Sequence, residues 1–147
     1  MSHYSSIFNA IAVAVKQAWD VESTSPGRSN KLNLQLPKAV ITLNSVQRSL
    51  SGRSVEQSWS WSIGGLFSLP TVPGIDPQEL MNNKAEALID ILTPFSELSN
   101  SIPSVPAPFG GVAYNPLIES WEPVPLDDAD NAVAVSLTFT CKSTVWQ

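Results

Sequence analysis

The six residues from 58 to 63 constrain the fold of this chain more than any other segment. They read Ser-Trp-Ser-Trp-Ser-Ile, so large apolar side chains alternate with small hydroxyl side chains. A period of two is typical of a β-strand, whose successive side chains point to opposite faces of a sheet. Trp59, Trp61 and Ile63 therefore share one face, and each indole buries roughly 200 Å² when it is covered. We expect this to be the inner face of a sheet, covered by helices.

The tryptophan strand, residues 55–69, is predicted to be the second strand of a long β-hairpin. Residues 38–50 precede it with alternating apolar side chains, and the Ser-Gly-Arg-Ser sequence at 51–54 is a turn signal between the two strands. Gly64 and Gly65 predict a bulge or bend, because glycine offers no side chain to pack on the pleat.

A second hairpin is predicted near the end of the chain. Its strands are residues 117–124 and 132–146, and apolar residues alternate with hydroxyl residues along the second of them. The polar segment 127–131 is expected to be a solvated loop between them.

Two amphipathic helices are predicted. Residues 4–19 place apolar side chains at spacings of three and four. A second helix begins with Asp76 as its cap, Pro77 at the first helical position and Glu79 three residues after the cap, and it ends before Pro94.

These elements predict an α+β fold in the order α-β-β-α-β-β, with an antiparallel sheet of two long hairpins packed on two helices. A chain of 147 residues with 43% hydrophobic residues fits one domain, residues 1–147. Residues 21–37 and 94–116 are rich in Pro, Gly, Ser or Asn and are expected to be irregular connectors.

The sequence offers little for catalysis. His3 is the only histidine, and its place near the start predicts a mobile terminus, which disfavours histidine triads and histidine-ligated metals. Cys141 is the only cysteine, so no internal disulfide is possible, and it continues an apolar strand face where we expect it to be buried. No glycine-rich phosphate loop lies between a strand and a helix. We predict no enzyme activity and no cofactor.

Three aspartates, Asp127, Asp128 and Asp130, could gather a hard cation such as calcium, because that ion binds oxygen ligands. The central glycine and distal glutamate of a calcium-binding loop are absent from this segment. A polar hairpin turn without a metal is therefore the preferred interpretation.

Charge is divided unequally along the chain. Residues 1–75 carry six basic and three acidic groups, whereas residues 76–147 carry two basic and ten acidic groups, so the net charge of −5 divides into +3 and −8. The basic residues could meet phosphates or could be solvated, but a divided charge best suits head-to-tail association of copies, and direct contact with DNA is not expected. The candidate interface residues are Arg28, Lys31, Arg48, Arg53, Asp127, Asp128 and Asp130.

No targeting segment is predicted. The apolar run at residues 7–15 lacks the flanking pattern of a signal peptide and is too short to span a bilayer. We expect the chain to fold in the cytoplasm.

The element order and the closing strand carry a resemblance to a known family. The helix at 7–19, the hairpin at 38–69, the Asp-Pro-Gln-Glu helix start at 76–79 and the Val-Ala-Val-Ser-Leu-Thr-Phe strand at 133–139 together resemble the tail terminator proteins of long-tailed bacteriophages. This resemblance implies a non-enzymatic virion protein, assembled in the host cytoplasm, that forms a hexameric ring on the end of the tail tube. Such a ring stops tube polymerisation and meets the head connector. The implied partners are further copies of the chain, the tail tube protein, a connector or neck protein, and a sheath protein.

Other hypotheses remain open at this point. Another neck or tail-completion protein of the virion is an alternative of the same class. A small binding module could use Trp59 and Trp61 as a platform for an apolar or glycan ligand, which requires both indoles to be exposed. A hydrolase or transferase is the least supported class, because the sequence offers no evident general base.

Overall fold

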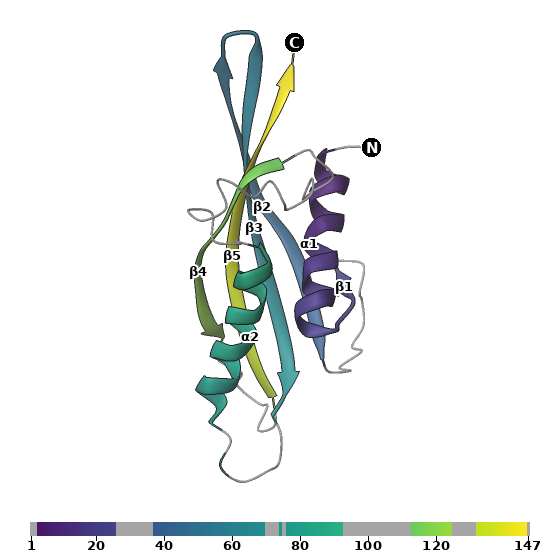
Figure 1. Cartoon of the computed structure of the whole chain (residues 1–147), viewed down its shortest axis with the longest axis vertical. Coiled ribbons are helices and arrows are strands. Elements are labelled where there is room, and N and C mark those ends of the chain that lie inside the picture. Colours follow the sequence, from purple (N-terminus) through teal and green to yellow (C-terminus); the bar gives the residue numbers. More distant parts are fainter. Residues whose placement is uncertain are drawn as a thin grey trace.

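The computed structural model describes residues 3–25, 37–69, 74, 76–92, 113–124 and 132–146. These residues form an α+β fold in which two helices lie against a β-sheet (Figure 1). In chain order the elements are α1 (His3–Trp19), β1 (Ser23–Thr24), β2 (Lys38–Ser51), β3 (Ser54–Ser68), α2 (Pro77–Leu92), β4 (Ala113–Val124) and β5 (Ala132–Trp146).

The described strands form one sheet in the order β1-β2-β3-β5-β4. Strand β3 pairs antiparallel with β2 on one side and with β5 on the other, and its pairing with β5 runs from Ser54 opposite Trp146 to Ser68 opposite Ala132. The two longest strands therefore lie at the centre of the sheet. Helices α1 and α2 both lie on the same face of the sheet in Figure 1.

The predicted order and strand pattern were incomplete. The short strand β1 pairs parallel with β2, so the sheet is mixed rather than wholly antiparallel, and the connector at 21–37 is not irregular throughout. Two polar residues, Ser23 and Thr24, carry no alternation that could reveal a strand. Their pairing with Ala39 and Val40 is set by tertiary context.

Strand β4 begins at Ala113, before the predicted start at residue 117, so the connector at 94–116 ends earlier than expected. A proline at position 116 argues against a strand in sequence-based reasoning. Here it lies on an edge strand between Tyr114 and Leu117, where the register with β5 shifts. The missing N–H of proline is tolerated at such a site.

The inner face of the sheet holds the core, as the alternation of the tryptophan strand predicts. Trp59 is 6% exposed and Trp61 is fully buried, and their rings stack with centroids 6.1 Å apart. Directly across from Trp61 on β5 is the fully buried Phe139. The helices contribute an apolar stripe to the same core, which includes Ile7, Ile11, Val15 and Leu88.

Gly64 and Gly65 do not form the predicted bulge, because β3 pairs with β5 without interruption through both residues. Gly65 lies on the inner face, where a Cβ atom would come within 2.8 Å of the Trp19 and Phe67 side chains. Those two rings pack edge to face with centroids 5.1 Å apart. The glycine is needed for close aromatic packing rather than for a bend.

The irregularity of this hairpin lies in β2 instead, between Leu43 and Ser45. Asn44 is the extra residue, and its side-chain amide donates a hydrogen bond to the Ser62 hydroxyl at 2.8 Å. Because one residue is added, the inner-face positions of β2 change from odd numbers to even numbers. Val46 pairs with Trp59 and so lies on the helix side of the sheet.

Candidate interaction arm

Strands β2, β3 and β5 extend together past the helices, at the top of Figure 1. We define the arm as residues 46–59 and 141–146, which comprise these projecting ends and, at their base, the core residues Trp59 and Cys141. Each strand residue of β3 in the arm pairs with one residue on either side, and β4 adds a fourth strand only at the base, where Ala113 pairs with Ser143. Three paired strands hold a projecting element more rigidly than a lone hairpin, which is marginally stable in water.

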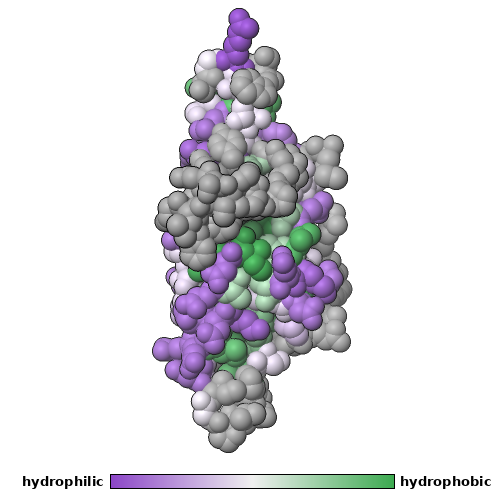
Figure 2. All heavy atoms as spheres, in the orientation of Figure 1, coloured by the Kyte–Doolittle hydropathy of each residue, from purple (hydrophilic) through white to green (hydrophobic). Residues whose placement is uncertain are grey.

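A tight turn closes the arm. Ser51 pairs with Ser54, so Gly52 and Arg53 are the two central residues. Gly52 has a φ of 64° and Arg53 is outside the positive-φ region, which is the pattern of a type II′ turn. The turn matches the twist of the strands and leaves Arg53 exposed at the end of the arm. The space-filling view shows hydrophilic atoms at this end (Figure 2).

An apolar row lies next to the turn on the helix side of the arm. Leu50, Val55 and Val145 are in direct cross-strand register, and 76% of Leu50 and 36% of Val145 are exposed. The bulge at Asn44 puts Leu50 on this face. An exposed leucine at the end of a projecting ribbon, beside an arginine, is suited to contact with another protein surface.

The next row towards the helices is polar, and it is buried at Gln57 and Ser143 but exposed at Arg48. It consists of Arg48, Gln57 and Ser143 in register across the three strands. Because a guanidinium group can only donate hydrogen bonds, the Gln57 amide turns its oxygen towards Arg48. That oxygen accepts from Arg48 Nε at 3.0 Å and from Nη2 at 3.1 Å, and the amide nitrogen donates to Ser143 Oγ at 3.2 Å.

His3 joins this polar row, which corrects the prediction that it belongs to a mobile terminus. It is the first residue of α1, and its Nδ1 atom lies 3.2 Å from Ser143 Oγ. Trp59 Nε1 also donates to Ser143 Oγ, at 2.9 Å. A histidine and a serine at this distance have the composition of a catalytic dyad. Ser143 is fully buried and holds two other hydrogen bonds, so no substrate can reach its oxygen.

Cys141 is also unsuited to catalysis. It lies in the core as predicted, and burial raises the pKa of its thiol from 9.0 to about 12. The thiol therefore stays protonated at neutral pH, and a protonated thiol is a poor nucleophile and a poor metal ligand. Within the described part of the chain, no group of three or more His, Cys, Asp or Glu residues could hold a metal ion.

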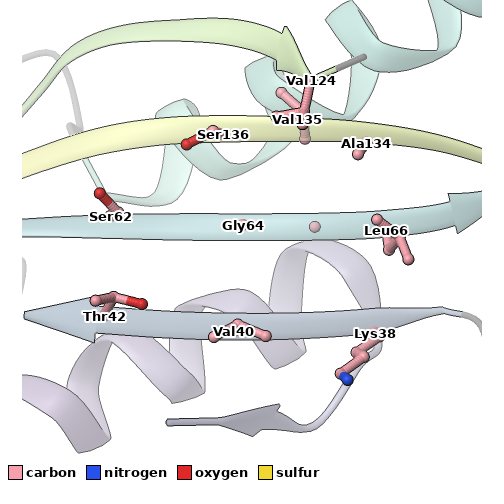
Figure 3. A pocket seen from close by; sticks show the side chains of 11 residues that line it. Lys38, Val40, Thr42, Ser62, Gly64, Leu66, Val124, Ala134, Val135 and Ser136 are labelled. Carbon is pink, nitrogen blue, oxygen red and sulfur yellow. The ribbon is translucent and has the colours of Figure 1, made fainter. Parts of the chain in front are cut away.

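The outer face of the sheet, opposite the helices, is rich in hydroxyl groups. It has a hollow of about 430 Å³ centred on Gly64 and its neighbour Val40, with Ser62, Thr42 and Ser136 along one end and Lys38, Leu66 and Val124 along the other (Figure 3). A second hollow of about 490 Å³ lies between Ser58 and Leu117. No aromatic residue lines the first hollow, whereas the lining of the second includes Trp59, Glu119 and Lys142.

Part of the acidic charge of residues 76–147 lies on the surface of α2. The outward-facing side chains of this helix and its cap are mainly acidic, and its single lysine, Lys84, lies over the Phe67 ring at 4.8 Å. The hydrophilic surface at the lower left of Figure 2 includes this part of the molecule. The exposed acidic residues are Asp76, Glu79, Glu86 and Asp90. The arm, with Arg48 and Arg53, therefore differs in charge from the helix.

Of the candidate interface residues, the structure brings Arg48 and Arg53 together on the arm. Arg48 is not simply solvated at a hairpin tip, because Gln57 binds its guanidinium group. The other candidates lie outside the described residues: Arg28, Lys31, Asp127, Asp128 and Asp130.

Sequence reasoning missed Gln57, Ser143 and Leu50. A signal for the first two was present, because each interrupts an apolar alternation: Gln57 stands between Val55 and Trp59, and Ser143 between Cys141 and Val145. Polar residues at apolar positions of two adjacent strands indicate a shared buried hydrogen bond.

No helix in the described parts of the chain combines the length and the hydrophobicity that crossing a membrane requires. Comparison with known proteins gives no family model that matches the chain and no curated protein that matches it.

Proposed function

We propose that this protein is a structural component of a bacteriophage virion, a tail terminator that forms a ring on the tail tube. The arm is the observation that carries the proposal. A rigid ribbon projects past the helices, exposes Leu50 and Arg53 at its end, and lies apart from the acidic surface of α2.

Such a molecule suits heterologous contacts, in which one surface of a copy meets a different surface of the next copy. Contacts of this kind produce closed rings when the rotation between copies closes, and open filaments when it does not. The arm offers one surface, and its charge differs from that of the remainder of the domain. A closed ring of six copies, as the resemblance implies, would cap the tube and stop its growth.

The proposed partners are other copies of the chain, the tail tube protein, a connector or neck protein, and a sheath protein. The ring would act in the tail or neck of the virion after assembly in the host cytoplasm. The function is proposed to be non-enzymatic. The buried Ser143 and the protonated Cys141 thiol support this view.

The tryptophan platform of the alternative binding module does not exist in this fold. Trp59 and Trp61 lie in the core, so a ligand cannot stack on them. A binding module would have to use the hydroxyl-rich outer face instead, and no aromatic residue lines the hollow around Gly64 on that face.

Mass photometry of the purified protein, alone and with tail tubes, tests the proposal. We expect a ring of defined stoichiometry, alone or on tubes, and electron microscopy should place it at tube ends. A strict monomer that never associates with tubes would contradict the proposal. Binding to a connector without binding to tubes would instead identify another neck component.

A further inference from the structure

We propose that the arm is tied to helix α1 by a hydrogen-bond chain that requires an uncharged His3, so that the arm loosens when His3 takes up a proton. The chain runs from His3 through Ser143 and Gln57 to Arg48. It joins α1, β5, β3 and β2. All of these bonds lie within a single copy of the protein, so they do not depend on whether copies form a ring.

The direction of the hydrogen bonds at Gln57 is set by Arg48. Arg48 presents two N–H groups to the Gln57 side chain, at 3.0 and 3.1 Å, and arginine has no acceptor. The Gln57 oxygen must therefore face Arg48, and its NH₂ group must face Ser143. Gln57 is 5% exposed, so water cannot readily replace either bond.

The Ser143 hydroxyl has its orientation set by the two donors that face its oxygen. Its oxygen receives one hydrogen bond from Gln57 and a second from Trp59 Nε1 at 2.9 Å, and an indole N–H can only donate. A hydroxyl oxygen has two lone pairs, and both are then used. The single proton of the hydroxyl remains, and His3 Nδ1, at 3.2 Å, is the acceptor in its direction.

His3 completes the hydrogen-bond chain as the acceptor of the Ser143 proton. Nδ1 can accept only if it carries no proton, so the neutral ring has its proton on Nε2. When the ring becomes an imidazolium, Nδ1 also carries a proton and faces a hydroxyl whose lone pairs are filled. His3 must then swing away, or Ser143 must give up its bond to Trp59 or Gln57. Either change breaks the link between α1 and the arm.

The charges around His3 do not offset this effect. Among the described residues of α1, β2, β3 and β5, the only carboxylate is that of Glu56, and Asp20 follows directly after α1. Asp20 pairs with Lys16 beyond the far end of α1, and Glu56 pairs with Lys142 on the outer face of the sheet. The cation nearest along the chain of bonds is Arg48. A protonated His3 would also lie at the N-terminus of α1, where a positive charge is unfavourable.

Amide hydrogen exchange at pH 8 and pH 5 tests the proposal, because histidine side chains in general change charge in this range. After correction for intrinsic exchange rates, we expect protection of arm amides in residues 46–50 and 55–59 to fall about fivefold at pH 5, as the loss of one hydrogen bond predicts. Amides in the middle of α2, around Ala85 and Leu88, serve as an internal control and should keep their protection.

Two variants separate this link from a general effect of acid. His3→Asn keeps an acceptor near the position of Nδ1 but cannot be protonated, so its arm should keep the same protection at both pH values. His3→Lys carries a positive charge at both values, so its arm should exchange faster already at pH 8. A fivefold loss at pH 5 that persists in His3→Asn would overturn the proposal, as would equal protection of the wild-type arm at both pH values.

Discussion

Gly64 and Gly65 are neighbours in the sequence, but they lie on opposite faces of β3 and so have different tolerances. A Cβ atom on Gly65 would lie 2.8 Å from ring atoms of Trp19 and Phe67, closer than packed atoms allow. A Cβ atom on Gly64 would have the Val40 carbonyl oxygen, at 3.9 Å, as its nearest neighbour. Only position 65 therefore lacks the space for a side chain.

We therefore expect Gly65→Ala to lower the free energy of unfolding by about 1–3 kcal/mol, the usual cost of overpacking a core. Gly64→Ala is the matched control and should be neutral or stabilising by up to about 1 kcal/mol, because alanine restricts the unfolded chain. Urea unfolding monitored by tryptophan fluorescence measures both. Equal free energies for the two variants would show that the Trp19 and Phe67 rings move aside at no cost.

Because the Cys141 thiol is buried, we expect the stability of the protein to fall at alkaline pH. Burial raises the pKa of its thiol from 9.0 to about 12 in the folded protein, so the unfolded chain loses this proton first as pH rises. The folded state then binds more protons, and stability falls between about pH 9 and pH 12, by up to about 1.4 kcal/mol per pH unit. Below pH 9 this contribution is fully present.

The measurement compares the wild type with Cys141→Ala in urea unfolding at pH 8, 9.5 and 10.5. Cys141→Ala should have a lower free energy of unfolding than the wild type because its side chain is smaller, and this loss does not depend on pH. Only the wild type loses further stability through its thiol, so the difference in free energy of unfolding should shrink as pH rises. A difference that stays constant across this range would show that the folded thiol ionises as readily as the unfolded one.

Side-chain environments could be predicted from the sequence where a local pattern sets them. The alternation around Trp59 and Trp61 predicted their burial, and the apolar phase of β5 predicted that of Cys141. His3 was placed wrongly because its partner, Ser143, lies 140 residues away. Contacts over that distance depend on the assembled sheet and leave no periodic signal.

At the scale of the elements, the bounds of α2 were predicted closely, because the residues that start the helix are adjacent in the sequence. The Asp76 side chain accepts a hydrogen bond from the backbone N–H of Gln78 at 3.0 Å, and the Asp76 carbonyl accepts the first bond of the helix, from Leu80. Pro77 is the first helical residue, where it needs no N–H partner.

We expect Asp76→Ala to reduce the free energy of unfolding by about 1 kcal/mol, because one N–H at the start of α2 loses its acceptor. Asp76→Asn keeps a side-chain oxygen and should retain most of the stability. Thermal unfolding followed by circular dichroism compares the two. Equal losses would show that the negative charge at the helix start, rather than the hydrogen bond, provides the stabilisation.

The arm shows which features of an element escape sequence reasoning. The hairpin and its turn were predicted, but the bulge at Asn44 was not, and it decides that Arg48 and Leu50 lie on the helix side of the sheet. The apolar spacing from Leu43 to Val46 is three rather than two, which is the trace of this bulge in the sequence. Such a spacing is ambiguous until the partner strand is known.

For the whole molecule, the structure separates the basic arm from the acidic surface of α2. The exposed Arg53 lies in the turn of the arm, whereas the acidic side chains of α2 lie on the outside of the helix layer. An attraction between the arm of one copy and an acidic surface of another would be electrostatic and weakened by salt, since the Debye length is about 10 Å at 0.1 M.

Arg53 is the residue with which to test this attraction, because reversing Arg48 would also remove the bonds to the buried Gln57. We expect Arg53→Glu to fold like the wild type but to self-associate about fivefold more weakly in 50 mM salt, the scale of an exposed ion pair that is reversed. Arg53→Lys keeps the charge and should associate like the wild type. Sedimentation equilibrium in 50 mM and 500 mM salt measures all three proteins. In 500 mM salt, the association of the wild type should weaken until it is close to that of Arg53→Glu. If the three proteins associate equally strongly in 50 mM salt, the charge of Arg53 has no part in the contact between copies.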